Sequence, residues 1–107
     1  MLVVLTTVAV ADEAERLAHA IVESRLAACV QVLPKMTSVY FWEGQVQNES
    51  EYLLIIKTLE EKFDELSEFI KQNHSYEVPE IVAIAAEKVA VDYLNWIRDV
   101  TSQNRER

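Results

Sequence analysis

The chain has 107 residues, half of them apolar, which is enough for one domain with a real core and too few for two. It carries 10 basic and 18 acidic residues, a formal net charge of −8, which argues against non-specific nucleic-acid binding. A single cysteine excludes an internal disulfide and a protein-held iron–sulfur cluster, and it fits a reducing compartment. We therefore expect one cytoplasmic domain over residues 1–107, with a polar tail over about 102–107.

The N-terminal stretch is apolar and β-branched. Residues 2–5 predict a short central strand that is buried on both faces. The stretch superficially resembles a secretory signal, but no basic residue precedes it, and the acidic residues Asp12 and Glu13 follow at once. No apolar run in the chain approaches the length that spans a membrane. We interpret this stretch as a first strand and expect neither a signal peptide nor a membrane association.

A first amphipathic helix follows. Asp12 is placed to cap it, and Glu15 stands three residues on, where its side chain can reach back to the cap. Apolar residues recur at three- and four-residue spacing, which predicts one buried stripe and an opposite wet face. The stripe consists of Ala14, Leu17, Ala18, Ile21 and Val22, and the wet face of Glu15, His19 and Glu23. His19 is therefore expected to be solvated and not to act as a ligand.

Three strands are expected in the middle of the chain. Their ranges are 29–33, ended by Pro34, then 37–42, and then 52–56. Residues 43–45, which include the only glycine, Gly44, make the turn between the last two. A polar stretch over residues 47–51 precedes the return strand. The pattern predicts a long hairpin whose tip projects beyond the core.

The second half of the chain predicts two more helices and one more strand. Thr58 is placed to cap a helix over about 60–73, and its apolar stripe consists of Phe63, Leu66, Phe69 and Ile70. An irregular connector over 74–80 leads to a fourth core strand over 81–86. A last helix over about 91–101 carries Tyr93, Trp96, Ile97 and Val100 on one side.

This order of elements predicts an α+β fold of the ferredoxin-like βαββαβ type, a split βαβ sandwich with an added C-terminal helix. Right-handed crossovers place both main helices on one face of a four-stranded antiparallel sheet. Alternation places Tyr40 and Trp42 on one side of their strand and Val39 and Phe41 on the other. Because the helices of one chain cover only one side, we expect other copies to cover the second side in a closed cyclic oligomer.

Five short motifs occur along the chain in a fixed order. They are residues 25–30 (RLAACV), 38–44 (SVYFWEG), 56–58 (IKT), 74–81 (HSYEVPEI) and 93–97 (YLNWI). With them the chain, from Leu5 to Ile97, resembles the CutA family of divalent-ion (copper) tolerance proteins. The resemblance implies a ferredoxin-like subunit in a homotrimer of PII-like plan. It also implies a cytosolic protein that serves the response to copper and other divalent metal ions, and not an enzyme.

The chain departs from the family's pattern at a few positions. Ser75 stands where the family usually has a proline after the connector histidine. Some members carry a cysteine in the first strand and a second histidine in the connector, both implicated in copper binding. Those positions are Thr6 and Asn73 in this chain. Of that ligand set only His74 remains.

His74 is the best local candidate for a metal contact, with Glu77 and Glu80 near it in sequence. Imidazole with carboxylates suits Cu(II) or Zn(II), so the cofactor we expect is Cu(II) or another divalent cation. A histidine just past a helix end can instead pair with the last carbonyls of that helix. Cys29 is a further possible ligand, but its apolar neighbours favour a small buried hydrophobe in the core.

Aromatic residues and one lysine could form a ligand cleft. Tyr40, Trp42, Tyr76 and Trp96 are candidates for its walls, although aromatic residues at such spacing more often belong to a core or an interface. Lys57 ends an apolar strand, so we expect it to be partly buried and paired with a carboxylate. It is either a snorkelling lysine or an anion-binding group in a cleft between subunits.

The sequence lacks the enzyme motifs that we considered: a Gly-rich phosphate loop, His-Glu-x-x-His and Gly-x-Ser-x-Gly. The leading interpretation is a trimeric cytosolic divalent-cation tolerance protein. A PII-like module that senses a small molecule or a protein partner through clefts between subunits is the alternative. A very stable scaffold without a ligand is the third. We expect further copies of the chain as partners, a protein partner that the sequence does not identify, and no nucleic acid.

Overall fold

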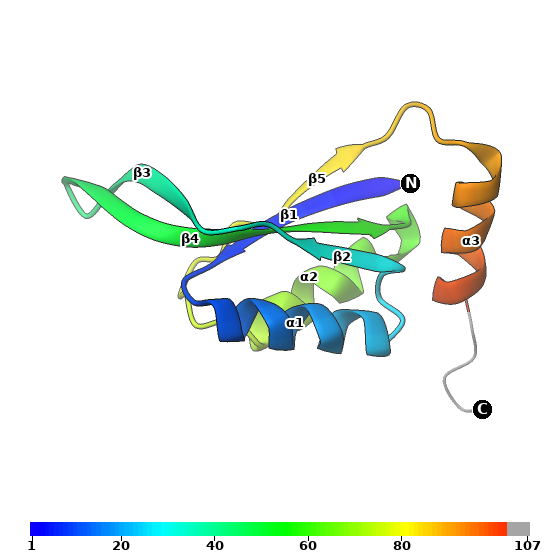
Figure 1. The fold of residues 1–107 in the computed structure, drawn as a ribbon, viewed down its shortest axis with the longest axis horizontal. Helices are drawn as coiled ribbons and strands as arrows, with labels where there is room; N and C mark the ends of the chain where they lie inside the picture. The colour runs from blue at the N-terminus through cyan, green and yellow to red at the C-terminus, as the bar shows by residue number, and fades with distance from the viewer. Residues whose placement is uncertain (103–107) are drawn as a thin grey trace.

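The computed structural model describes residues 1–102 as a sheet with two helices against one face and a third helix at one end (Figure 1). The elements are β1 (Leu2–Val8), α1 (Ala11–Glu23), β2 (Cys29–Val32), β3 (Met36–Trp42), β4 (Gln45–Thr58), the 3-10 turn η1 (Glu60–Lys62), α2 (Phe63–Gln72), β5 (Val82–Ala85) and α3 (Val91–Thr101). Apart from Ser102, the predicted tail lies outside the described residues. None of the helices in the described part combines the length and the apolar character that a membrane span requires.

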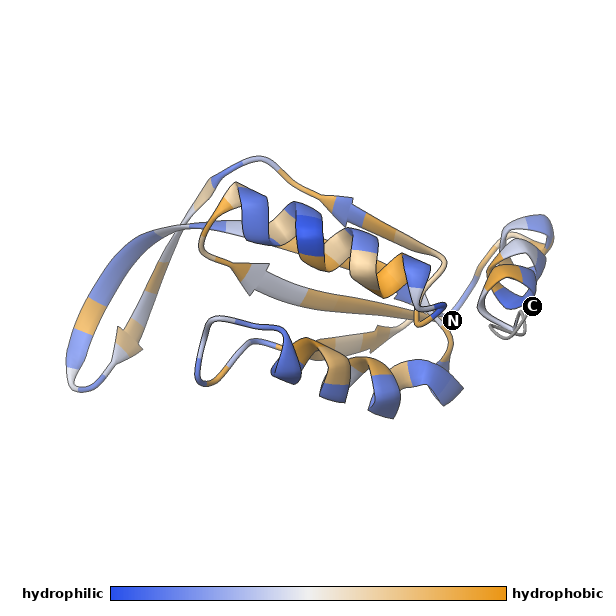
Figure 2. Cartoon of the chain, turned by 90° about the horizontal axis from the view of Figure 1, so that it is seen from below, coloured by the Kyte–Doolittle hydropathy of each residue, from blue (hydrophilic) through white to orange (hydrophobic). Residues whose placement is uncertain are grey.

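The sheet has the topology that the order of elements predicts. All its strand pairs are antiparallel, in the order β2-β4-β1-β5, and β3 pairs with the far half of β4. If the hairpin strand β3 is left out, the sheet contains the second, third, first and fourth strands of the chain in that order. This is the strand order of a split βαβ sandwich. Helices α1 and α2 run side by side beneath the sheet, and α3 stands apart at one end (Figure 2). The predicted ferredoxin-like α+β class is confirmed.

The hairpin of β3 and β4 projects well beyond the helices (Figure 1). Strand β4 has 14 residues and is longer than predicted, because the polar stretch over 47–51 goes on pairing with β3. The turn holds Glu43 at φ 51° and Gly44 at φ 78°. Two positive φ values in a two-residue loop define the turn whose twist matches that of the flanking strands. The predicted projecting hairpin is therefore confirmed.

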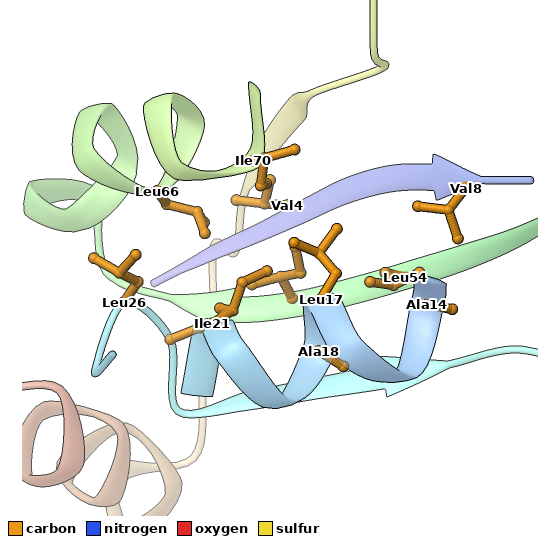
Figure 3. Packing of buried hydrophobic residues seen from close by; sticks show 12 residues of the cluster. Val4, Val8, Ala14, Leu17, Ala18, Ile21, Leu26, Leu54, Leu66 and Ile70 are labelled. Carbon is orange, nitrogen blue, oxygen red and sulfur yellow. The ribbon is translucent and has the colours of Figure 1, made fainter. Parts of the chain in front are cut away.

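The core lies between the sheet and the two helices (Figure 3). Alternate residues of β1 and β4 point toward the helices, which meet them with the predicted stripes. The main buried cluster contains Val4, Val8, Leu54 and Ile56 from the strands, Ala14, Leu17, Ala18 and Ile21 from α1, Leu26 and Ala27, and Leu66 and Ile70 from α2. Val22 is exposed and does not belong to the predicted stripe. Phe63 and Phe69 are partly buried and pack against this cluster.

Neither predicted side-chain cap forms. Helix α1 begins at Ala11 with Val10 as its cap, so Asp12 lies in the first turn, where its carboxylate accepts a hydrogen bond from Arg16 at 3.2 Å. Thr58 ends β4, and its hydroxyl donates to the carbonyl of Leu26 at 2.7 Å. Thr58 is of a residue type that often caps helices. Its sequence context does not show that it ends the preceding strand and hydrogen-bonds to Leu26 instead.

Helix α1 ends in a Schellman motif. The N–H of Leu26 donates to the carbonyl of Ile21 at 3.2 Å, and the N–H of Arg25 donates to that of Val22 at 3.0 Å. Arg25 takes the left-handed conformation that this motif requires, with φ 62°. Its guanidinium reaches the carbonyl of Val100 at 3.2 Å. The reversal thus places Leu26 in the core and ties the end of α1 to α3.

The other face of the sheet, the open face, is formed by Val3 and Leu5 of β1, Leu53 and Ile55 of β4, and Val82 and Ile84 of β5. The register sets these residues beside one another across the strands, so their side chains share one face. They point away from the helices, whereas the side chains of the core residues point toward them. Val82 is 46% exposed and Ile84 51% exposed. The prediction that β5 is a core strand is therefore wrong for a single chain: β5 is an edge strand, and no described helix covers its open face.

Candidate functional site

A cleft of about 610 Å³ lies between the hairpin of β3 and β4 and the connector over residues 74–80. Its aromatic side chains are Tyr40, Trp42 and Tyr76, and its acidic ones are Glu51, Glu77 and Glu80. The hairpin supplies Tyr40, Trp42 and Glu51, and the connector supplies the others. Tyr40 and Trp42 are two residues apart on β3, so both side chains point to the same side of the strand, as predicted. The cleft thus joins three predicted aromatic residues with two predicted metal contacts.

His74 fixes the start of the connector from beneath the cleft. Its side chain is fully buried, and Nε2 lies 2.7 Å from the carbonyl oxygen of Thr7. Its Nδ1 accepts the backbone N–H of Tyr76 at 3.0 Å. A carbonyl only accepts and an N–H only donates, so Nε2 carries the proton and Nδ1 does not. This histidine binds a strand carbonyl, whereas the alternative from the sequence was a carbonyl at the end of the preceding helix.

Glu13, which the sequence analysis did not single out, holds the next residue of the connector. Its two carboxylate oxygens accept the backbone N–H and the hydroxyl of Ser75, each at 3.0 Å. One of these oxygens also lies 3.8 Å from Nδ1 of His74. Glu13 is buried beside the apolar stripe of α1, four residues before Leu17. Glu13 lies one helical turn before Leu17, and this spacing is the sequence signal that could have predicted its burial.

Glu51 is the most buried acidic group of the cleft, with only 7% of its surface exposed. The phenol of Tyr76 donates a hydrogen bond of 2.7 Å to its carboxylate. Burial and then this hydrogen bond raise the pKa of Tyr76 above its ordinary value of 10.0. Desolvation and then the neighbouring Glu49 also raise the pKa of Tyr40. Both phenols therefore stay protonated near neutral pH and face an acidic environment.

The structure brings the predicted metal contacts together only in part. Glu77 and Glu80 line the cleft, but both ring nitrogens of His74 are bonded within the chain, so coordination would break one of these bonds. Within residues 1–102, no group of three or more His, Cys, Asp or Glu side chains is placed to hold a metal ion. A single chain therefore does not supply a complete metal site, and the metal roles of these residues stay predictions.

Cys29 lies away from the cleft. It pairs in register with Lys57, which pairs in turn with Val3, four residues along β1 from Thr7. At about 3.3 Å per residue, this separates Cys29 from the strand carbonyl that holds His74 by roughly 13 Å along the strands, and β4 lies between them as well. The thiol is half-buried and not part of the core, contrary to the expectation, because its strand position points to the open face.

Lys57 and Trp96 also lie outside the cleft. The ammonium of Lys57 donates to the side-chain carbonyl of Gln31 at 2.8 Å and lies 5.9 Å from the ring centroid of Tyr93. The expected carboxylate partner is thus wrong, because the neighbouring strand presents an amide at this position. The ring of Trp96 lies 5.7 Å from that of Tyr93. Of the five predicted cleft residues, three therefore line the cleft, Trp96 belongs to α3, and Lys57 lies beside that helix.

The fold and the cleft define a class of protein: a ferredoxin-like subunit with a projecting hairpin and an acidic, aromatic cleft along that hairpin. Residues 2–100 match the family described as CutA1 divalent ion tolerance protein. The chain belongs to this family. It is a family of divalent-cation tolerance proteins and not a known enzyme family.

Similar proteins come from several kingdoms. The divalent-cation tolerance protein CutA of Thermus thermophilus is 46% identical over 99 residues, which cover 92% of this chain and 96% of that protein. The chloroplastic CutA 1 of rice (Oryza sativa subsp. japonica) is 44% identical over 103 residues, which cover 96% of this chain and 58% of the rice protein. The chain thus spans little more than half of that relative. The structure of CutA1 from Pyrococcus horikoshii superposes with a TM-score of 0.91 at 34% identity, covering 96% of this chain and all of that one.

Proposed function

We propose that the chain works as a homotrimeric divalent-cation tolerance protein of the cytoplasm that binds copper or other divalent ions. The open face is the observation that supports the trimer. Apolar side chains of β1, β4 and β5 lie on this face of the sheet, and the helices cover only the opposite face. Contiguous apolar surface of this kind marks an interface. Family membership supports the role in divalent-cation tolerance.

Glu77 and Glu80 are the cation contacts that we propose, because both carboxylates line the cleft. Carboxylate oxygens suit hard and borderline divalent ions. Since one chain offers no set of three ligands in its described part, the site draws its remaining ligands from another copy. His74 joins this set only if it exchanges one of its two hydrogen bonds for the metal. Cys29 is a separate, softer candidate on the open face.

Calorimetric titration of Cu(II) and of Zn(II) tests this proposal. We expect the double variant Glu77→Gln/Glu80→Gln to bind at least about tenfold more weakly than the wild type, because two anionic ligands are lost. The variant Glu15→Gln/Glu23→Gln changes the net charge equally on the exposed face of α1 and should bind like the wild type. Equal affinity of the cleft variant and the wild type would exclude these carboxylates as contacts. Equal affinity of His74→Ala would exclude the imidazole.

The single cysteine supports the proposed cytoplasmic location, because it suits a reducing compartment. Relatives are named for other compartments, such as the chloroplastic protein of rice. Immunoblots of fractionated cells test the location. Recovery of the native protein with a membrane, organelle or periplasmic fraction would contradict it.

A second candidate function is a PII-like module that senses a small molecule or a protein partner. The observation that favours it is the meeting of Tyr40, Trp42 and Tyr76 in one cleft. In a thermal-shift screen, a true cleft ligand should stabilise Lys57→Ala, whose side chain lies outside the cleft, and should fail to stabilise Tyr40→Ala. A screen whose hits all depend on Lys57 would count against this cleft.

A further inference from the structure

Glu51 is a buried carboxylate without a countercharge. It is 7% exposed, and among the described residues its carboxylate accepts one hydrogen bond, from the neutral phenol of Tyr76. No Lys, Arg or His is among the residues of the described chain that line the cleft. Burying an ionised carboxylate is costly unless a cation pairs with it. The site therefore lacks one positive charge.

The walls around Glu51 are of the kind that attracts organic cations. Tyr40 is 38% exposed and Trp42 is 44% exposed, and both lie on the cleft side of β3. A cation within about 6 Å of an aromatic face is attracted to the negative side of the ring. Glu77 and Glu80 add negative charge at the connector. The raised pKa values of Tyr40 and Tyr76 have nearby carboxylates among their causes, which is consistent with a negative potential in the cleft.

We propose that this cleft binds an organic ammonium ion, primary or quaternary, with its nitrogen beside Glu51 and its carbon atoms against Tyr40, which Trp42 follows on the same side of β3. The volume of about 610 Å³ lies in the range of small-molecule sites. A metal ion at this cleft needs further ligands from another copy, whereas an ammonium ion needs only groups that one chain supplies. The proposal rests on the cleft being a ligand site, as in the second candidate function, and it names the ligand class.

The fluorescence of Trp42 provides a direct test. The chain has two tryptophans, so the Trp96→Phe variant leaves Trp42 as the only reporter. Tetramethylammonium and butylammonium are titrated beside their neutral counterparts, tert-butanol and 1-butanol. We expect a saturable change with the ammonium ions alone. An equal response to the alcohols, or no saturable response to either ammonium ion, would overturn the proposal.

Variants in the same background locate the charge that binds. Glu51→Gln keeps a side-chain acceptor for Tyr76 but removes the negative charge, so ammonium affinity should fall at least about tenfold. Glu15→Gln removes one charge from the exposed face of α1 and should leave the affinity unchanged. Unchanged affinity in Glu51→Gln would contradict the assignment. Loss of ammonium binding with Cu(II) binding retained would reject this ligand class and leave the metal proposal intact.

A basic side chain of another copy could also neutralise Glu51, and the ligand-free protein separates the two cases. If Glu51 awaits a soluble cation, Glu51→Gln should melt at the same or a higher temperature than the wild type, because a buried charge without a partner is removed. If another copy already pairs with it, Glu51→Gln should melt lower and assemble more weakly. That second outcome would overturn the proposal.

Discussion

Thr6 and Thr58 are fully buried threonines that differ in one respect. The hydroxyl of Thr58 donates to Leu26, whereas that of Thr6 has no hydrogen-bond partner among the described residues. Thr6→Val keeps the shape and should raise the free energy of unfolding by about 1 kcal/mol. Thr58→Val leaves a buried carbonyl without its donor and should lower it by about 1–3 kcal/mol. Urea unfolding measures both, and a loss of stability in Thr6→Val would contradict this account.

Tyr76 makes stability depend on pH in the alkaline range. Its folded-state pKa lies above the ordinary 10.0, so the folded state holds the phenolic proton more tightly than the unfolded state. The contribution is fully present below about pH 10 and is lost as the pH rises further. Urea unfolding between about pH 8 and 11 should therefore show a fall that Tyr76→Phe makes shallower. An equally steep fall in this variant would show that Tyr76 does not contribute.

At the scale of residues, the sequence indicated which side chains belong to the site better than it indicated which groups they contact. It singled out Tyr76, which lines the cleft, and His74, which is buried beneath it and holds the backbone of Tyr76. The sequence did not single out Glu51, because this residue ends a polar stretch and looks exposed. It becomes buried only when its strand pairs with β3 and the connector packs over it. Cys29 was assigned to the core because its neighbours are apolar, but its strand position points to the open face.

The turn of the hairpin depends on one glycine at the scale of elements. Gly44 has φ 78°, and a Cβ atom there would meet nothing within 4 Å. Gly44→Ala should therefore lower stability through the backbone alone, by about 1–2 kcal/mol. Glu43→Asn is the matched change, because asparagine favours the positive φ of this position, and it should raise stability. Thermal unfolding of both variants tests this, and equal stability of Gly44→Ala and the wild type would contradict it.

The connector over 74–80 depends on the acceptor that α1 provides. Glu13→Ala removes the partner of both Ser75 donors, so stability should fall by about 1–3 kcal/mol. Amide hydrogen exchange should rise in the connector more than in the core strands. Glu15→Ala, on the exposed face of the same helix, serves as the control. Unchanged exchange in the connector of Glu13→Ala would show that other contacts hold it.

The sequence predicted which elements form better than where they end. The spacing of Ala14, Leu17 and Ile21 placed α1 and its buried face correctly, because one side of a helix repeats every three or four residues. The caps assigned to Asp12 and Thr58 were wrong, since other partners engage both side chains. Helix ends depend on such tertiary partners, which periodicity does not report.

At the scale of the whole molecule, the topology explains both the uncovered sheet and the cleft. Two helices on one face follow from right-handed crossovers, which the order of elements predicts. The cleft depends on β1, the hairpin and the connector, which are far apart in the sequence and meet only after folding. Residue types could suggest an aromatic cleft, but only the strand register of Lys57 and the packing of Trp96 against Tyr93 in α3 showed that these two residues lie outside it.

Assembly on the open face is the central claim of the proposed function. Sedimentation equilibrium at micromolar concentration tests it, with Ile84→Asp as the variant on the open face and Val22→Asp as a matched change on the exposed side of α1. We predict that the wild type and Val22→Asp sediment with three times the chain mass of 12.3 kDa, and that Ile84→Asp dissociates because it buries a charge in the interface. A stable wild-type monomer, or a trimer that Ile84→Asp leaves intact, would contradict the claim.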